Sequence, residues 1–92
     1  VGTENSGSPP APLSLFPNPA TGRWIMSWEA TSAEPVTLSI LDLSGRVVRL
    51  EYLFQQRGVN AWSSTFPLPA GLYQVRLNQP EGMRSVRLML QE

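Results

Sequence analysis

Three residue types that carry much of protein chemistry are missing from this 92-residue chain: cysteine, histidine and lysine. Without cysteine the chain has neither a disulfide framework nor a thiolate metal site, and without histidine it has no imidazole ligand or general base. Asp42 is the only aspartate, and the carboxylates show no paired spacing that would set an acid against a base. We therefore expect no enzyme activity, no bound metal and no cofactor.

A large net charge and long apolar runs are also absent. Seven arginines balance seven acidic residues, so the chain has no strong field to attract nucleic acid, and the scattered arginines are typical of a solvated surface. No apolar run approaches the length that crosses a bilayer, so no direct membrane insertion is expected. The hydrophobic share of 41% and the charged share of 15% favour one small folded domain over a disordered tail.

The first twelve residues differ in composition from the rest of the chain. Residues 1–12 are rich in Gly, Ser and Pro and have almost nothing to bury, as in a semi-extended interdomain linker. The chain starts at Val1 without an initiator methionine or a signal peptide, which indicates a piece of a longer protein. We expect a linker over residues 1–12 and a monomeric domain over residues 13–92.

From Leu13 onward, apolar residues recur with period two, and no segment shows a sustained helical stripe. Turn residues interrupt the alternation about every eight to twelve positions, the spacing of a sandwich or barrel. The pattern predicts an all-β domain, an immunoglobulin-like seven-stranded antiparallel β-sandwich. The expected strands cover residues 13–16, 23–28, 36–42, 46–54, 60–66, 72–78 and 83–90.

The alternation also assigns the two faces of each strand. The apolar face is expected to form the core, with Trp24, Met26, Trp28, Val36, Leu38, Ile40, Val48, Leu50, Tyr52, Tyr73, Val75 and Leu77. The polar face is expected in solvent, with Arg23, Ser27, Thr37, Ser39, Arg49, Glu51, Gln74 and Arg76.

Two of the connecting turns have clear residue chemistry. Pro17, Asn18 and Pro19 predict a rigid turn, which Gly22 is expected to end with a positive φ. In the second turn Asp42 is placed to accept hydrogen bonds from backbone N–H groups two or three residues on. Gly45 suits a left-handed position of that hairpin, and Gly82 repeats the arrangement before the last strand. Asp42 and Arg46 flank the hairpin, where an exposed ion pair contributes about 0–1 kcal/mol.

The segment Leu68-Pro69-Ala70-Gly71-Leu72-Tyr73 resembles the tyrosine corner of Greek-key sandwiches. In that corner the tyrosine hydroxyl bonds back to the backbone a few residues upstream. The same bond is expected from Tyr73, which would lock the connection between the two sheets.

The order of four segments resembles the C-terminal sorting domain of cargo proteins of the Bacteroidetes type IX secretion system, also called Por secretion. The first two are the Phe-Pro-Asn-Pro turn at 16–19, followed by Ala20 and Gly22, and the hairpin with Asp42, Gly45 and Arg46. The third is Gly-x-Tyr-x-Val, with Gly71, Tyr73 and Val75, and the fourth is the terminal run Arg87-Leu88-Met89-Leu90-Gln91-Glu92. The family usually has Lys near the start of the last segment, where this chain has Arg87.

The resemblance implies a sorting signal that performs no chemistry. The cargo, a domain N-terminal to this one in the same chain, would cross the inner membrane by its signal peptide and fold in the periplasm. Outer-membrane shuttle and translocon proteins would then carry it across the outer membrane. A surface sortase-like peptidase would remove the domain by cutting in the linker, and the cargo would be released or attached to a lipopolysaccharide.

Recognition is expected at the end of the chain, because a terminal edge strand presents backbone groups and alternate side chains for strand addition. The candidate recognition residues are Gly71, Tyr73, Val75, Arg87, Leu88, Met89 and Leu90. The turn residues around them are expected to be structural: Pro17, Asn18, Pro19, Gly22, Asp42, Gly45, Arg46 and Gly82.

The alternative function is a non-catalytic carbohydrate-binding or accessory module of a secreted enzyme. Small β-sandwiches of that kind often bind polysaccharides through an aromatic platform. The rings available for one are Trp24, Trp28, Trp62, Tyr52 and Tyr73. Core packing is expected for most of them, and least clearly for Trp62, which shares its face with Ser64.

Overall fold

Two β-sheets packed face to face make up the described part of the chain. The computed structural model describes residues 13–64, 66–80 and 82–92, so the linker expected at residues 1–12 lies outside the described residues. The described chain has seven strands and no helix, which confirms the all-β sandwich, and each strand begins and ends within three residues of its predicted bounds. They are β1 (Ser14–Phe16), β2 (Ile25–Ala30), β3 (Glu34–Leu41), β4 (Val47–Gln55), β5 (Gly58–Ser63), β6 (Gly71–Gln79) and β7 (Gly82–Leu90).

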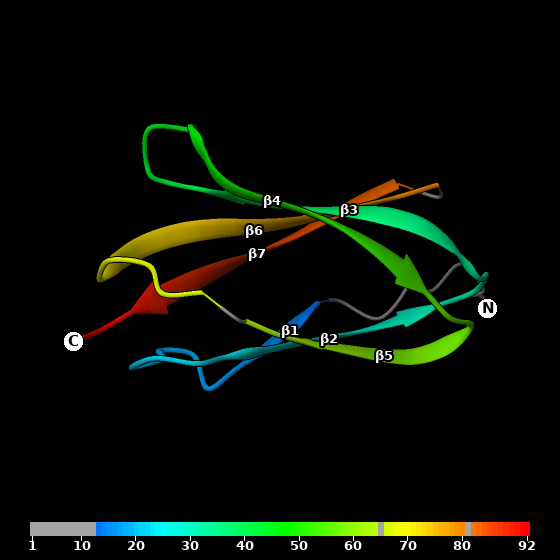
Figure 1. The fold of residues 1–92 in the computed structure, drawn as a ribbon, viewed down its shortest axis with the longest axis horizontal. Helices are drawn as coiled ribbons and strands as arrows, with labels where there is room; N and C mark the ends of the chain where they lie inside the picture. The colour runs from blue at the N-terminus through cyan, green and yellow to red at the C-terminus, as the bar shows by residue number, and fades with distance from the viewer. Residues whose placement is uncertain (1–12, 65, 81) are drawn as a thin grey trace, which may run out of the picture.

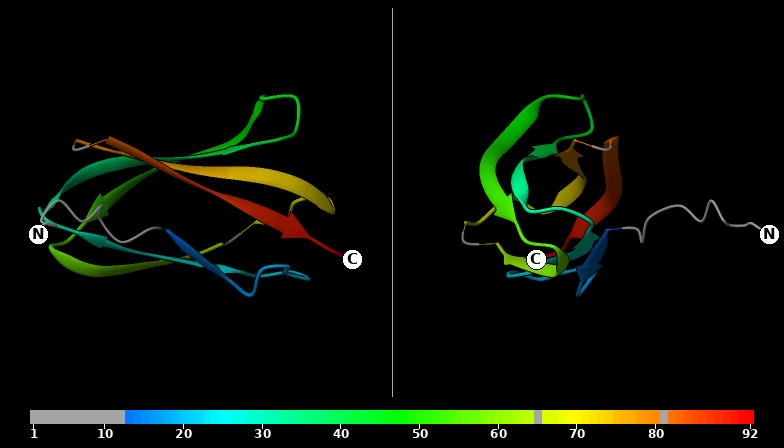
Figure 2. Two further views of the ribbon diagram at one scale, coloured as in Figure 1. Left: turned by 180° about the vertical axis from the view of Figure 1, so that it is seen from behind. Right: turned by 90° about the vertical axis from the view of Figure 1, so that its right-hand side faces the viewer.

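All strand pairs are antiparallel, and they form a three-stranded sheet in the order β1-β2-β5 and a four-stranded sheet in the order β4-β3-β6-β7. Figure 1 shows the two layers, and Figure 2 shows them from behind and from one end. In a constant-type immunoglobulin domain the fourth strand belongs to the other sheet. Here β4 stays beside β3, so β4 and β7 form the two edges of the larger sheet.

The core lies between the sheets and contains most of the predicted side chains. Most of the twelve residues expected inside are nearly or fully inaccessible to solvent, among them Trp24, Met26, Trp28, Leu38, Ile40, Tyr73, Val75 and Leu77. Val36 is buried with them, and Val48 is partly buried against the cluster. The last strand adds Leu88 and Leu90, so β7 is a core strand as well as an edge strand.

The predicted orientation of β4 is wrong. Leu38 lies opposite Glu51, and Ile40 lies opposite Arg49, and because opposite residues share a face, Arg49 and Glu51 point to the inner side. Leu50 and Tyr52, which were expected in the core, point outward and are 45% and 79% exposed.

Edge position explains this error, because the inner face of an edge strand lies at the margin of the sandwich, where polar groups still reach water. The Arg49 side chain keeps 44% of its accessible surface, pairs with Glu51 at 2.6 Å and lies 4.2 Å from the centre of the Phe66 ring. A polar-apolar alternation therefore does not tell which face of such a strand points inward.

A buried polar network also crosses the core and was not anticipated from the sequence. Gln55, at the end of β4, is fully buried, and its Oε1 accepts hydrogen bonds from Trp28 Nε1 at 3.1 Å and from Gln79 Nε2 at 2.9 Å. Its Nε2 donates to the Ser32 carbonyl at 3.0 Å. The network joins β2, β4 and β6 and satisfies the buried Trp28 N–H.

Candidate functional site

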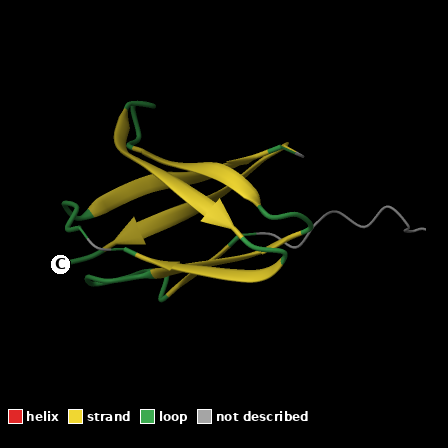
Figure 3. Cartoon of the chain, turned by 45° about the vertical axis from the view of Figure 1, so that its right-hand side comes forward, coloured by secondary structure: helices red, strands yellow, loops and turns green. Residues whose placement is uncertain are grey.

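The four sequence segments meet at one end of the sandwich, beside the C-terminus. In the views of Figure 1 and Figure 2 this end carries the 17–22 turn, the hairpin after β3, the loop before β6 and the end of β7. Figure 3 shows the loops among them in green. We call the surface formed by residues 17–22, 42–46, 68–71 and 87–92 the motif end. Segments that are about 70 residues apart in the chain are thus neighbours in the fold.

The Pro-Asn-Pro turn binds the free edge of β7. Asn18 Nδ2 donates to the Arg87 carbonyl at 2.8 Å, and Asn18 Oδ1 accepts from the Met89 N–H at 3.0 Å. Ala20 continues this pairing, because its N–H donates to the Met89 carbonyl at 2.9 Å and its carbonyl accepts from the Gln91 N–H at 2.7 Å. The Asn18 amide therefore takes the place of a neighbouring strand at this edge.

This contact corrects the expectation that the terminal strand has unpaired backbone groups. Around Arg87, Met89 and Gln91 the outward backbone groups are already paired within the chain, which leaves less of this edge for strand addition. The geometry of the turn also differs from expectation. The Phe16–Pro17 and Asn18–Pro19 peptide bonds are cis, and Gly22 does not have a positive φ.

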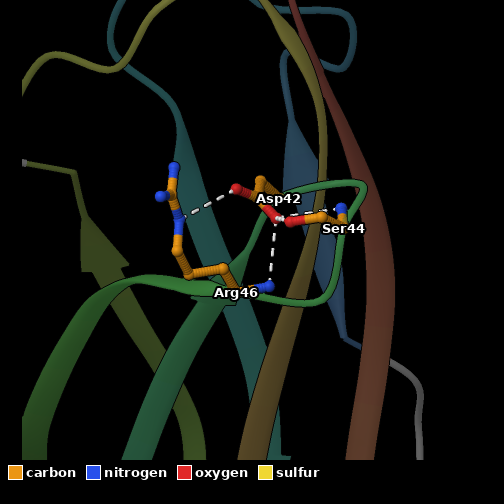
Figure 4. Close-up of polar contacts among 3 residues, drawn as sticks. All are labelled: Asp42, Ser44 and Arg46. Atoms are coloured by element: carbon orange, nitrogen blue, oxygen red, sulfur yellow. Dashed lines mark hydrogen bonds and ion pairs between the residues drawn. The ribbon is translucent and has the colours of Figure 1, made fainter.

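The hairpin after β3 is organised by one carboxylate, drawn in Figure 4. Asp42 Oδ1 accepts from the Ser44 N–H at 2.9 Å, the Ser44 hydroxyl at 2.6 Å and the Arg46 N–H at 3.0 Å. Arg46 Nε lies 3.4 Å from Asp42 Oδ2, and Gly45 has a φ of 88°, the left-handed conformation predicted for it. The Ser44 hydroxyl bond, the backbone bonds and the Arg46 charge hold the pKa of Asp42 below its usual value.

The tyrosine corner is confirmed. The Tyr73 hydroxyl donates to the Pro69 carbonyl at 2.6 Å, four residues upstream, and the Tyr73 ring is buried. Gly71 and Tyr73 lie directly opposite Leu90 and Leu88 on β7. The third motif, on β6, is therefore paired directly with the fourth motif, on β7.

The strand registers place the second motif beside the third and fourth motifs, in one row across the sheet. Leu41, which precedes the Asp42 hairpin, lies opposite Gln74, and Gln74 lies opposite Arg87. A shallow hollow of about 380 Å³ separates the hairpin from this part of β6 and β7 and is lined by Asp42, Leu43, Gln74 and Arg87 among others. A second hollow of about 590 Å³ opens beside the C-terminus, between Arg23, Phe66, Leu68 and Glu92.

Six of the seven candidate recognition residues divide into an exposed and a buried group. Arg87 and Met89 have exposed side chains on the outer face of β7. Tyr73, Val75, Leu88 and Leu90 are buried in the core beneath them. Gly71 is exposed in the turn that starts β6, and Gly82, at the other end of the sheet, has the positive φ expected of its hairpin.

The tryptophans that could have formed a sugar platform contact the core instead. Trp24 and Trp28 are 1% and 4% exposed, and the partly buried Trp62 meets Trp24 edge-on, with ring centres 5.6 Å apart. Ser64, on the same predicted face as Trp62, is also buried, and its hydroxyl accepts a hydrogen bond from the Trp24 backbone N–H at 3.1 Å. Tyr52 is exposed, but on the outer face of the other sheet.

The described residues show little that could perform chemistry. Among them, no group of three or more acidic residues is placed to hold a metal ion. The same part of the chain contains no helix of the length and hydropathy that would span a membrane. What the motif end does offer is a rigid surface of turns and strand ends, fixed by hydrogen bonds that span the sequence.

Comparison with protein families matches residues 14–91 to the model of the secretion system C-terminal sorting domain. The chain belongs to this family. It is a C-terminal sorting signal for type IX secretion, as its resemblance to that family implied. A comparison with curated proteins gives no match. Domains of this family are in general non-catalytic, interact with the type IX secretion system and direct an attached cargo toward the cell surface or out of the cell.

Proposed function

We propose that the type IX machinery reads the sorting domain at its motif end. The supporting observation is the bond pattern of Asn18, which ties the first family motif to the last one across the free edge of β7. The second and third motifs lie in the same rows of the sheet. Four motifs that are spread through the chain thus form one surface, which one partner could contact in a single binding event.

Within this surface, the exposed side chains of Arg87 and Met89 are the proposed contacts. Arg87 supplies a positive charge at the position where the family usually has lysine, so the charge and not the compact ammonium group would be recognised. Tyr73, Val75, Leu88 and Leu90 would act indirectly, because they are buried and hold β7 in place. Asn18 would act in the same way from the edge.

The remaining steps follow the family. We propose that the domain, as a monomer, passes through the periplasm with its cargo and is delivered by outer-membrane shuttle and translocon proteins. A surface sortase-like peptidase would then cut within residues 1–12, after which the cargo is anchored or released. The domain itself would have no enzyme activity and need no cofactor.

Substitution of Arg87 tests this proposal. A cargo fusion that carries Arg87→Glu should reach the surface about tenfold more slowly than the original, because a repelled charge at a contact site weakens binding. Arg87→Lys should retain export. The free energy of unfolding of both variants should stay within about 0.5 kcal/mol of the original, since Arg87 is exposed.

Arg57→Glu is the matched control, because Arg57 is exposed in the loop between β4 and β5, at the end of the sandwich opposite the motif end. Its export should be unchanged. If Arg87→Glu is exported at the original rate, or if Arg57→Glu is impaired to the same degree, the motif end is not the recognised surface.

A further inference from the structure

The outer face of the four-stranded sheet has an uncommon composition for a surface. Along β4, four large apolar side chains point outward: Val47, Leu50, Tyr52 and Phe54, which we call the β4 stripe. They are 51%, 45%, 79% and 59% exposed. Neither the core nor the motif end uses them.

The β4 stripe lies on an edge strand, so backbone groups as well as apolar side chains are available to a partner there. In the described chain β4 pairs only with β3, so its other edge is not covered by a strand of this domain. A nine-residue edge strand with exposed apolar side chains is a site of unwanted association unless a partner covers it. Scattered single apolar residues need no such explanation, but this row is continuous apart from one bulge.

The strands of this sheet present charges of only one sign on their outer face. The registers align Leu50 with Ser39, Arg76 and Ser85 in one row, and Leu41 with Gln74 and Arg87 in the next. Arg76 and Arg87 are therefore the charged residues that the described strands present on this face. The Asp42 carboxylate, in the hairpin after β3, lines the hollow beside Arg87 but is paired with Arg46. Of the acidic residues in these strands, Glu34 and Glu51 belong to the inner side, in register with Gln55 and Leu38.

This separation of charge occurs in a chain whose formal net charge is zero. The face consequently combines an apolar row along β4 with a cationic side over β6 and β7, where Met83 and Met89 are also exposed. A membrane surface is not the favoured partner, because binding to anionic lipid typically needs a cluster of about four to eight basic residues. Two arginines beside an apolar row fit a protein surface of matching character.

We propose that this face is a second docking surface of the sorting domain, for a protein of the secretion machinery that presents apolar side chains to the β4 stripe and a carboxylate to Arg76. The inference rests on the proposed function and deepens it. This partner binds the outer face of the four-stranded sheet while the secretion machinery binds the motif end. The aromatic residues Tyr52 and Phe54 are its anchors, since exposed aromatic side chains dominate the energetics of such contacts.

Export kinetics test the proposal. In a cargo fusion of the full chain, Tyr52→Ser combined with Phe54→Ser, and separately Arg76→Glu, should each slow the appearance of cargo at the surface about tenfold. Val59→Ser is the matched control, because Val59 is 77% exposed on β5 of the other sheet and its loss should leave export unchanged. Urea unfolding of the purified domains verifies that the variants are folded.

The outcomes separate this proposal from the proposed function. If the variants of the β4 stripe and Arg76 are exported at the original rate while Arg87→Glu is impaired, the second docking surface is overturned and the reading of the motif end stands. If all of them are exported normally, both proposals fail.

Three binding experiments with the purified domain can also overturn the assignment of the partner. Sedimentation of vesicles of phosphatidylglycerol with the domain would assign the face to a membrane if Tyr52→Ser abolishes it. A dimer in analytical ultracentrifugation that Tyr52→Ser dissociates would assign the face to a second copy. Saturable binding to a polysaccharide that the same variant abolishes would assign it to a carbohydrate.

Discussion

At the scale of single residues, two short polar side chains organise the motif end. Asn18 imitates a strand with its amide, and Asp42 gathers three donors on one carboxylate oxygen. In both cases the side chain satisfies backbone groups that would otherwise need water, so each works as a local substitute for sheet pairing.

The Asn18 contact is tested by Asn18→Ala. The loss of two hydrogen bonds to β7 should lower the free energy of unfolding by about 1–2 kcal/mol and accelerate hydrogen exchange at the Met89 amide, which is one of the donors. The measurement is urea unfolding together with residue-resolved amide exchange. Asn78→Ala, an exposed asparagine on β6, is the control and should change neither quantity. Unchanged exchange at Met89 in Asn18→Ala would contradict the contact.

The Asp42 hairpin predicts a dependence of stability on pH. Because the folded pKa of Asp42 lies below its unfolded value, the carboxylate stabilises the fold fully above about pH 4 and progressively less as the pH falls through the lower folded pKa. The difference in free energy of unfolding between the original protein and Asp42→Asn should therefore shrink on acidification from pH 6 to about pH 2. A difference that is constant over this range would show that the charge does not contribute.

At the scale of the strands, the central claim is the orientation of β4. Leu38 and Leu50 lie on adjacent strands, but Leu38 is fully buried and Leu50 is 45% exposed. Leu38→Ala should cost about 2–5 kcal/mol of unfolding free energy, whereas Leu50→Ala should cost no more than about 0.5 kcal/mol. Chemical denaturation of the two variants measures both, and equal losses would contradict the register of β3 and β4.

The strands also show how far the sequence determines this fold. Period-two alternation was enough to predict the core faces of β2, β3 and β6, because each carries buried apolar residues on its inner side. On the outer side of β3, however, Ser39 was expected in solvent and is buried, as is Leu41. The alternation was not enough for β4, where the apolar Leu50 and Tyr52 lie on the outer face and Arg49 and Glu51 on the inner one. Gln55 was missed because nothing near it in the sequence distinguishes it from the exposed Gln56 or shows that Trp28 and Gln79 are its partners.

The candidate site was predictable in part for similar reasons. Local chemistry predicted the Tyr73 bond and the Asp42 turn, since both form within five residues of the chain. The Asn18 contact with β7 could not be predicted, because Asn18 precedes its partners Arg87 and Met89 by 69 and 71 positions in the chain. The family motifs contained the signal that these segments belong together, but not the bonds that connect them.

At the scale of the whole molecule, the sorting domain presents a rigid end and a broad apolar-cationic face, both built on one small core. The motif end lies at the C-terminal end of the sandwich in the views of Figure 1 and Figure 2. A signal of this kind depends on the fold as a whole, because the buried residues of β6 and β7 hold the exposed ones in position. Variants that unfold the domain should therefore also abolish sorting.

The most direct measurement is export of a foreign reporter. The full 92-residue chain is fused to the C-terminus of a protein that carries its own signal peptide, in a host with the type IX apparatus and in the same host without it. The reporter should reach the cell surface or the medium only in the first host, and the reporter without the domain should stay in the periplasm in both. A folded fusion that stays in the periplasm of the first host would show that this domain does not act as a sorting signal.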